Sequence, residues 1–179
     1  GQSSCLDATA GNYVAGSGAT SQTPCALGTY QPSDGQSSCL NADLHHYVDT
    51  TGATAQTACP TATYTANTGS TSVSDCIGSE PGYYTPPGSS PIPCPVGTYQ
   101  PSAGQTSCLN ATPGHYVDSI AATSQTACPA GTYNPNNAST SISACTDTDA
   151  GHYSGSGAAT QTACAPGTYQ PSTGQSSCL

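Results

Sequence analysis

Residues 97–109 read GTYQPSAGQTSCL, and nearly the same sequence stands at residues 28–40, GTYQPSDGQSSCL, and at residues 167–179, GTYQPSTGQSSCL. The chain also opens on the end of this phrase, GQSSCL at residues 1–6. A phrase that returns in register predicts a tandem array of small units and not one domain of 179 residues. Because both ends of the sequence fall inside the phrase, we expect it to be a window from a longer array.

The composition does not support a conventional hydrophobic core. The chain has no Met, Phe or Trp, and its Leu, Ile and Val are too few to fill the interior of a compact domain of this length. Eleven regularly placed Cys offer covalent closure instead. Disulfides persist in oxidising compartments, so we expect a secreted or cell-surface, extracellular protein.

The charge pattern excludes several partners. The formal charge is -9, and the chain contains no Lys or Arg. Neutralising phosphates needs basic side chains, so nucleic acid is not expected as a partner. No run of about 18 apolar residues exists, and we expect no membrane insertion in this segment.

The cysteines set the period of the array. Short intervals of 14 or 17 residues alternate with long intervals of 18 to 20 residues. The Cys stand at positions 5, 25, 39, 59, 76, 94, 108, 128, 145, 164 and 178. This alternation predicts repeat modules at 25–58, 59–93, 94–127 and 128–163, with partial modules at 1–24 and 164–179.

Tyrosine and glycine keep register with the cysteines. Gly stands two residues before most of the repeated Tyr, with His45 and Ala62 as departures, and predicts a bend there. The segment Gln-Pro-Ser-x-Gly reads as a turn between two extended arms. The long interval, with Tyr116-Val117 followed by Ala-Thr-Ser-Gln-Thr at residues 122–126, predicts a second short hairpin. Helical periodicity is absent. The predicted fold is small, disulfide-rich and all-β: an elongated tandem array of two-hairpin modules of roughly 35 residues, without a single globular core.

The pairing of the cysteines has two solutions on spacing alone. Pairing across the short intervals leaves Cys5 without a partner in this window, so that it would bond to an upstream or neighbouring chain; pairing across the long intervals leaves Cys178 unpaired. The short pairing is favoured because the turn signal lies inside the short interval. It joins Cys25 to Cys39, Cys59 to Cys76, Cys94 to Cys108, Cys128 to Cys145 and Cys164 to Cys178.

The phrase C-x-x-G-T-Y-Q-P-S-x-G-Q-S-S-C, from Cys25 to Cys39, resembles the ephrin-receptor-like cysteine-rich repeat, which is similar to the first half-module of tumour necrosis factor receptor ectodomains. The resemblance implies a small extracellular β module and supports the short pairing. Family members continue with a second Cys pair. Here the position three after the second Cys is Ala8, Ala42, Ser79, Ala111 or Thr148, so the second family disulfide is missing.

Candidate chemistry is sparse. His46, His115 and His152 share one register, which suggests a metal row, but a module length separates them and surface His is the favoured interpretation. Asp147-x-Asp149 echoes the opening of a calcium loop without its remaining ligands. We expect no enzyme, no metal and no cofactor.

Glycosylation has a better basis. Asn110-Ala111-Thr112 and Asn137-Ala138-Ser139 satisfy the N-glycan acceptor pattern, and Pro113 weakens the first. Dense Ser and Thr near Pro resemble O-glycosylated stalks. Unmodified polar surface is the alternative, and the intact mass separates the two.

The sequence favours a structural building protein of an extracellular, glycosylated filament or surface coat that associates with itself. The alternative is a receptor or adhesin ectodomain stalk that binds a protein or carbohydrate partner, for which Tyr83 and Tyr84 in the least repetitive segment are the candidate contacts. Ice or mineral binding by Thr rows is a third, weaker hypothesis.

Overall fold

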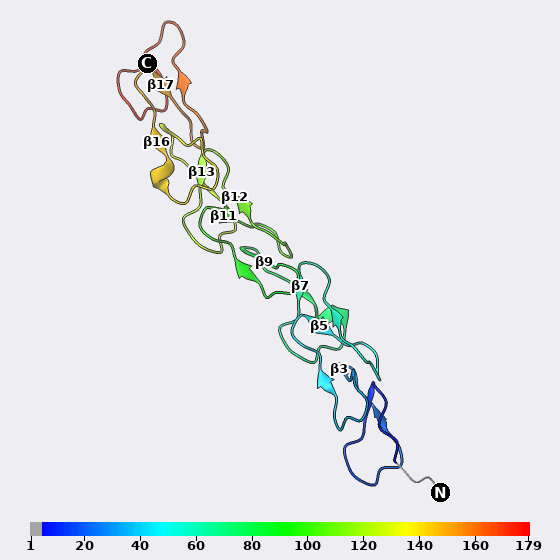
Figure 1. The fold of residues 1–179 in the computed structure, drawn as a ribbon. Helices are drawn as coiled ribbons and strands as arrows, with labels where there is room; N and C mark the ends of the chain where they lie inside the picture. Colours follow the sequence, from blue (N-terminus) through cyan, green and yellow to red (C-terminus); the bar gives the residue numbers. More distant parts are fainter. Residues whose placement is uncertain (1–4) are drawn as a thin grey trace. The chain divides into compact units, whose positions relative to one another are not determined.

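The computed structural model describes residues 5–179 as a succession of short antiparallel hairpins (Figure 1). Each two-stranded sheet pairs a two-residue strand with the next strand in the chain. The pairs are β1–β2 (Asn12–Tyr13 with Thr23–Pro24), β3–β4 (Thr29–Tyr30 with Leu40–Asn41), β5–β6 (His46–Tyr47 with Thr57–Ala58), β7–β8 (Thr63–Tyr64 with Ile77–Gly78), β9–β10 (Tyr83–Tyr84 with Ile92–Pro93), β11–β12 (Thr98–Tyr99 with Leu109–Asn110), β13–β14 (His115–Tyr116 with Thr126–Ala127), β15–β16 (Thr132–Tyr133 with Thr146–Asp147) and β17–β18 (His152–Tyr153 with Thr162–Ala163). The predicted class of small, disulfide-rich, all-β repeats without a single globular core is confirmed.

Two single turns of 3-10 helix account for the difference between the short cysteine intervals. η1 (Val73–Asp75) and η2 (Ile142–Ala144) each add three residues, and each lies in one of the hairpins whose cysteines are 17 apart. Ser72 and Asp75 form a capping box at η1, so the turn has its own start signal. Within residues 5–179 no α-helix is present, because Gly, Pro and Thr recur too closely for one to form.

The chain divides into two compact units. One unit contains the described residues up to Ser79 together with Thr85–Pro91, and the other contains Glu80–Tyr84 with Ile92–Leu179. Both units are built from the same kind of hairpin. The finer module boundaries at 25–58, 59–93, 94–127 and 128–163 stay a prediction from the cysteine spacing.

Backbone hydrogen bonds join successive hairpins within each unit. The amide of Gly11 donates to the carbonyl oxygen of Gln31 at 2.8 Å, and the amide of Gly97 donates to Val117 at 2.7 Å. The same bond recurs at Gly28, Gly82, Gly114, Gly131 and Gly151. A second bond runs back from the loop of the following hairpin, as from the amide of Ala138 to the oxygen of Ala111 at 2.8 Å. Polar backbone groups thus hold neighbouring repeats together where a larger core would hold a globular domain.

Most of the buried side chains occupy two repeated positions, with Tyr116 and Ser139 as the exceptions. One is the opening position, four residues before the first strand of each hairpin, which is buried at Ala8, Cys25, Ala42, Ser79, Cys94, Ala111, Cys128 and Thr148. The other follows directly after the tyrosine of the first strand and is buried at Gln31, Val48, Thr65, Thr85, Gln100, Val117, Asn134, Ser154 and Gln170. Small or hydrogen-bonding residues dominate both positions, so the interior holds little apolar volume.

Candidate functional site

Disulfides close alternate hairpins across the short cysteine intervals. We call the hairpins around β3–β4, β7–β8, β11–β12 and β15–β16, and the final loop, the cystine hairpins. Their bonds join Cys25 to Cys39, Cys59 to Cys76, Cys94 to Cys108, Cys128 to Cys145 and Cys164 to Cys178, with Cα atoms 5.6 to 5.8 Å apart. In these hairpins one Cys takes the opening position and the other directly precedes the second strand or, in the last loop, Leu179. Each bond therefore ties the start of a hairpin to its end.

A glutamine side chain performs the corresponding closure in the hairpins between them. Gln56 directly precedes β6, as Cys39 directly precedes β4, and the opening residue is Ala42. The Gln56 Oε1 accepts from the Asp43 amide at 2.7 Å, and its Nε2 donates to the Asp43 carboxylate at 2.7 Å. The same clamp joins Gln22 to Thr9, Gln125 to Thr112 and Gln161 to Asp149. We call β1–β2, β5–β6, β13–β14 and β17–β18 the glutamine hairpins.

The glutamine clamp closes hairpins that carry no disulfide. Ala42 and Ala111, the opening residues of two of these hairpins, are 0% exposed, and Thr148 is equally buried. A small side chain fits there, and the neighbouring amide bonds to Gln across the hairpin. A hydrogen bond of this kind contributes about 1 kcal/mol, against about 3 kcal/mol for a disulfide closing a loop of this length. The glutamine hairpins are therefore the weaker members of the array.

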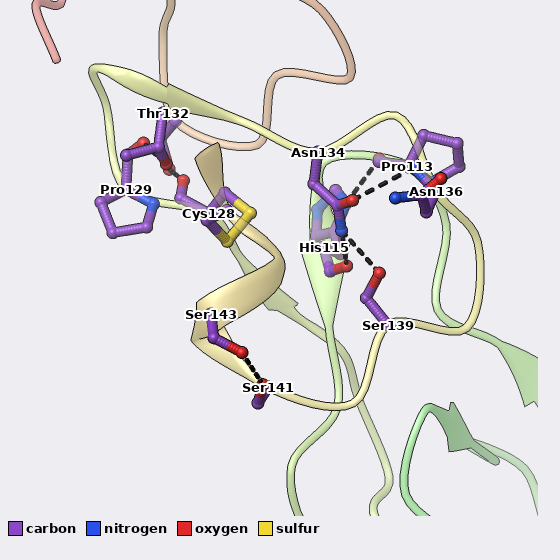
Figure 2. Close-up of a disulfide and its surroundings, with 12 residues drawn as sticks. Pro113, His115, Cys128, Pro129, Thr132, Asn134, Asn136, Ser139, Ser141 and Ser143 are labelled. Atoms are coloured by element: carbon purple, nitrogen blue, oxygen red, sulfur yellow. Dashed lines mark hydrogen bonds between the residues drawn. A yellow bond between two sulfur atoms is a disulfide. The ribbon is translucent and has the colours of Figure 1, made fainter. Parts of the chain in front are cut away.

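The glutamine of the repeated phrase GTYQPS stabilises a turn inside the cystine hairpins. Gln100, which is 4% exposed, donates from Nε2 to the Ser107 oxygen at 2.8 Å and accepts the Ser102 amide at 3.1 Å. Gln31 and Gln170 make the same pair of bonds in their own turns. Asn134 takes this position in β15–β16 and donates instead to Ser139 and His115 (Figure 2). A buried amide thus holds both arms of these four turns, whereas Thr65 takes the position in β7–β8.

The glycine two residues before the tyrosine has a steric function as well as a conformational one. Gly114 has a φ of +83°, and a Cβ there would overlap the carbonyl of Gly157 in the next hairpin but one. The same close approach occurs at Gly11, Gly28, Gly82, Gly97 and Gly131. His45 and Ala62, the two departures from glycine, keep positive φ values of 67° and 66°. The predicted bend is therefore present at both departures.

The candidate metal ligands stay separate. His46 and His152 each place Nδ1 beside the carbonyl oxygen two residues earlier, and His115 Nδ1 lies near Pro113 and Thr112. Asp149 is engaged with Gln161, and the Asp147 side chain lies against the Gly174 turn. Among residues 5–179 no group of three His, Cys, Asp or Glu is arranged to hold a metal ion.

The two N-glycan acceptor segments approach each other. Asn110 ends β12 and Asn137 lies in the loop between β15 and β16, and both are exposed. The amide of Ala138 donates to the carbonyl of Ala111, so a backbone bond links the two segments. Their hydroxyl residues differ, because Thr112 is exposed whereas Ser139 is 8% exposed.

Two further candidates are a cysteine and a pair of tyrosines. Cys5 is exposed and carries a free thiol. Tyr83 and Tyr84 form β9, whose hairpin has Pro91 where the glutamine hairpins have Gln. This hairpin is the one departure from both kinds of closure among the nine described strand pairs.

Sequence reasoning missed the glutamine clamps, although a signal was present. Gln stands three residues before Cys25, Cys59, Cys128 and Cys164. The sequence shows the regular position of this glutamine but does not identify its hydrogen-bond partner. The partner is a backbone amide, which almost any residue provides.

Short β-hairpins stapled at alternate repeats, with glycine and cysteine in register, define a disulfide-rich repeat protein of the kind found in extracellular domains. A family model described as "Tyrosine-protein kinase ephrin type A/B receptor-like" matches residues 11–59 and 82–128, which together make up more than half of the chain. The chain belongs to this ephrin-receptor-like family of cysteine-rich repeats, as its sequence predicted, and the family is not one of enzymes. Comparison with curated proteins gives no match.

Proposed function

We propose that the chain is a structural building protein of an extracellular, glycosylated filament or surface coat. The observation that supports this most is the repeated backbone bonding between hairpins. The amide of Gly114 bonds to Asn134 as that of Gly97 bonds to Val117, both at 2.7 Å, so one joint is reused along the second unit. A joint of this kind can be repeated without a closing core, which is what a polymer of repeats requires.

The chemistry of the surface agrees with a passive, secreted material. The disulfides require an oxidising compartment during assembly, and the absence of Lys and Arg removes the usual cleavage sites of trypsin-like proteases. In the part of the chain described, no helix has the length and apolar character needed to cross a bilayer. We propose secretion or display on the cell surface, with glycans on Ser and Thr and at Asn110 and Asn137.

Electron microscopy of the oxidised chain tests self-association. Filaments are expected under native conditions, and they should be lost when the chain is reduced and alkylated. Isolated short particles over a wide range of protein concentration would contradict the proposal. Intact mass tests the glycans separately, since an unmodified chain has a mass of 17.6 kDa.

A receptor or adhesin stalk is the second candidate, and the β9–β10 hairpin favours it. This hairpin lacks both the disulfide and the glutamine clamp, and its loop is rich in Pro. Capture of a protein or carbohydrate partner that is lost in Tyr83→Ala/Tyr84→Ala would support a stalk. His152→Ala/Tyr153→Ala, in the same register, is the matched control, and equal loss in both variants would count against this candidate.

A further inference from the structure

We propose that Asn137 accepts an N-glycan only before its own hairpin closes, so that formation of the Cys128–Cys145 disulfide ends its availability. The inference rests on the proposed function in one respect, because it needs a chain that enters a glycosylating secretory route. It concerns the order of two covalent events on one hairpin. Filament formation is a separate property.

The folded hairpin has room for the product of the reaction. Asn137 is exposed in the loop between β15 and β16. Pro135 and Asn136, which precede it in the same loop, are exposed as well. A sugar attached to the Asn137 side chain therefore extends into solvent.

The same hairpin hides a group that the reaction needs. Ser139, the third residue of the acceptor, is 8% exposed, and its Oγ accepts a hydrogen bond from Asn134 Nδ2 at 2.8 Å (Figure 2). Asn134 is itself 0% exposed, and its Nδ2 also donates to the His115 oxygen at 3.0 Å. The Ser139 hydroxyl is therefore both covered and engaged in the folded state.

The chemistry of transfer makes this burial decisive. The Asn amide nitrogen forms a bond to C1 of an oligosaccharide carried on a lipid diphosphate, the bond from C1 to the diphosphate oxygen breaks, and the amide loses a proton. The acceptor pattern specifies Ser or Thr two residues after Asn, so the transferring enzyme must reach the hydroxyl together with the amide. A buried Ser139 denies it that access.

Backbone contacts keep the loop from opening locally. Ala138 has a φ of 54°, and its amide donates to Ala111 at 2.8 Å. The amide of Val117 donates to the carbonyl of Ser139 at 2.9 Å. These two bonds tie the residues that follow Asn137 to the preceding hairpin, β13–β14, while the disulfide closes the 17-residue separation that contains the loop.

Asn110 provides an internal comparison. It lies two residues beyond Cys108, outside the loop that the Cys94–Cys108 bond closes. Thr112 is exposed, although its hydroxyl contacts Gln125 and His115. Closure of its hairpin therefore leaves the Asn110 acceptor more accessible, and the proposed timing applies to Asn137 alone.

Expression of the full chain as a secreted protein in a glycosylating cell tests the order of events. Occupancy of Asn137 is measured by peptide mass on chain recovered from inside the cell, so that variants that fail to leave the cell are still counted. In Cys128→Ser/Cys145→Ser, occupancy should rise severalfold over the parent. In the matched Cys25→Ser/Cys39→Ser variant, whose disulfide closes a hairpin of the other compact unit, occupancy of Asn137 should stay at the parent level, and Asn137→Gln identifies the glycan.

A second measurement does not depend on folding in the cell. Purified, unglycosylated chain is given a membrane oligosaccharyltransferase and its lipid-linked donor, either oxidised or after reduction and alkylation. Only the reduced chain should be modified at Asn137. Equal modification of both forms would overturn the timing, and no modification of either form would overturn Asn137 as an acceptor. Microscopy of Asn137→Gln reports on the filament independently.

Discussion

The carbonyl oxygen of Gly157 occupies the space that a side chain on Gly114 would need. Gly114→Ala therefore adds a steric overlap to the strain of a φ of +83°. The strain costs about 1–2 kcal/mol and the overlap about 1–3 kcal/mol, so the free energy of unfolding should fall by about 2–5 kcal/mol.

Gly151→Ala is the control for this prediction. Gly151 has a φ of +82°, and no atom lies within 4 Å of the position of its Cβ. Gly151→Ala should therefore lower the free energy of unfolding only by the backbone strain, about 1–2 kcal/mol. Denaturant unfolding of both variants measures the difference, and equal losses would show that the contact between hairpins is unimportant.

Gln100→Ala should destabilise the β11–β12 hairpin by about 1–3 kcal/mol, because the Ser102 amide and the Ser107 oxygen both lose their hydrogen-bond partner, the buried Gln100 side chain. Gln105→Ala, which removes an exposed glutamine bonded only to the Ala103 oxygen, should change stability by less than about 0.5 kcal/mol. The denaturant midpoints of the two variants are compared with the parent. A loss in Gln105→Ala as large as that in Gln100→Ala would refute the assigned role.

A new disulfide should form in Ala111→Cys/Gln125→Cys. These positions open and close a glutamine hairpin as Cys94 and Cys108 open and close the cystine hairpin before it, with the same separation of 14 residues. The bond should contribute about 3 kcal/mol against about 1 kcal/mol lost with the glutamine clamp, so the free energy of unfolding should rise by about 2 kcal/mol.

Thiol alkylation in denaturant without reductant, followed by intact mass, checks the bond, with Ala111→Cys alone as the control whose extra thiol is alkylated. Two additional free thiols in the oxidised double variant would show that the glutamine clamp does not stand in the place of a disulfide.

Reduction should unfold the array because the cysteines replace a core. Full reduction and alkylation should remove the slow amide exchange of the hairpin ladders, whereas Cys94→Ser/Cys108→Ser should lose it around β11–β12 and the adjacent hairpins. Hydrogen exchange with peptide resolution makes the comparison. A reduced chain that kept its protection would contradict the account of stability given above.

The sequence allowed the all-β repeats to be predicted because cysteine and tyrosine mark each hairpin directly. A second hairpin was expected in the long cysteine interval, from Tyr116-Val117 and residues 122–126, and β13–β14 lies there. The contact between Gly114 and Gly157 was beyond sequence reasoning, because it joins hairpins that are next neighbours but one. Glycine predicted the bend but gave no indication of what lies against it.

The candidate site was harder to foresee than the fold. The acceptor pattern identified Asn137 from three letters, but the burial of Ser139 depends on Asn134, which replaces the glutamine found in the phrase GTYQPS. The acceptor pattern indicates neither the burial of Ser139 nor its hydrogen bond to Asn134. Such effects depend on side-chain geometry, which repetition of the sequence does not specify.

The alternation of cystine and glutamine hairpins has a mechanical consequence. When the chain is pulled from its two ends, each disulfide prevents a loop of 14 or 17 residues from extending. The glutamine hairpins between them are closed by hydrogen bonds alone. At about 3.5 Å of extended length per residue, each locked loop keeps back about 5–6 nm. The glutamine hairpins therefore unfold at lower force than the cystine hairpins. The disulfides then limit the maximum extension of the array.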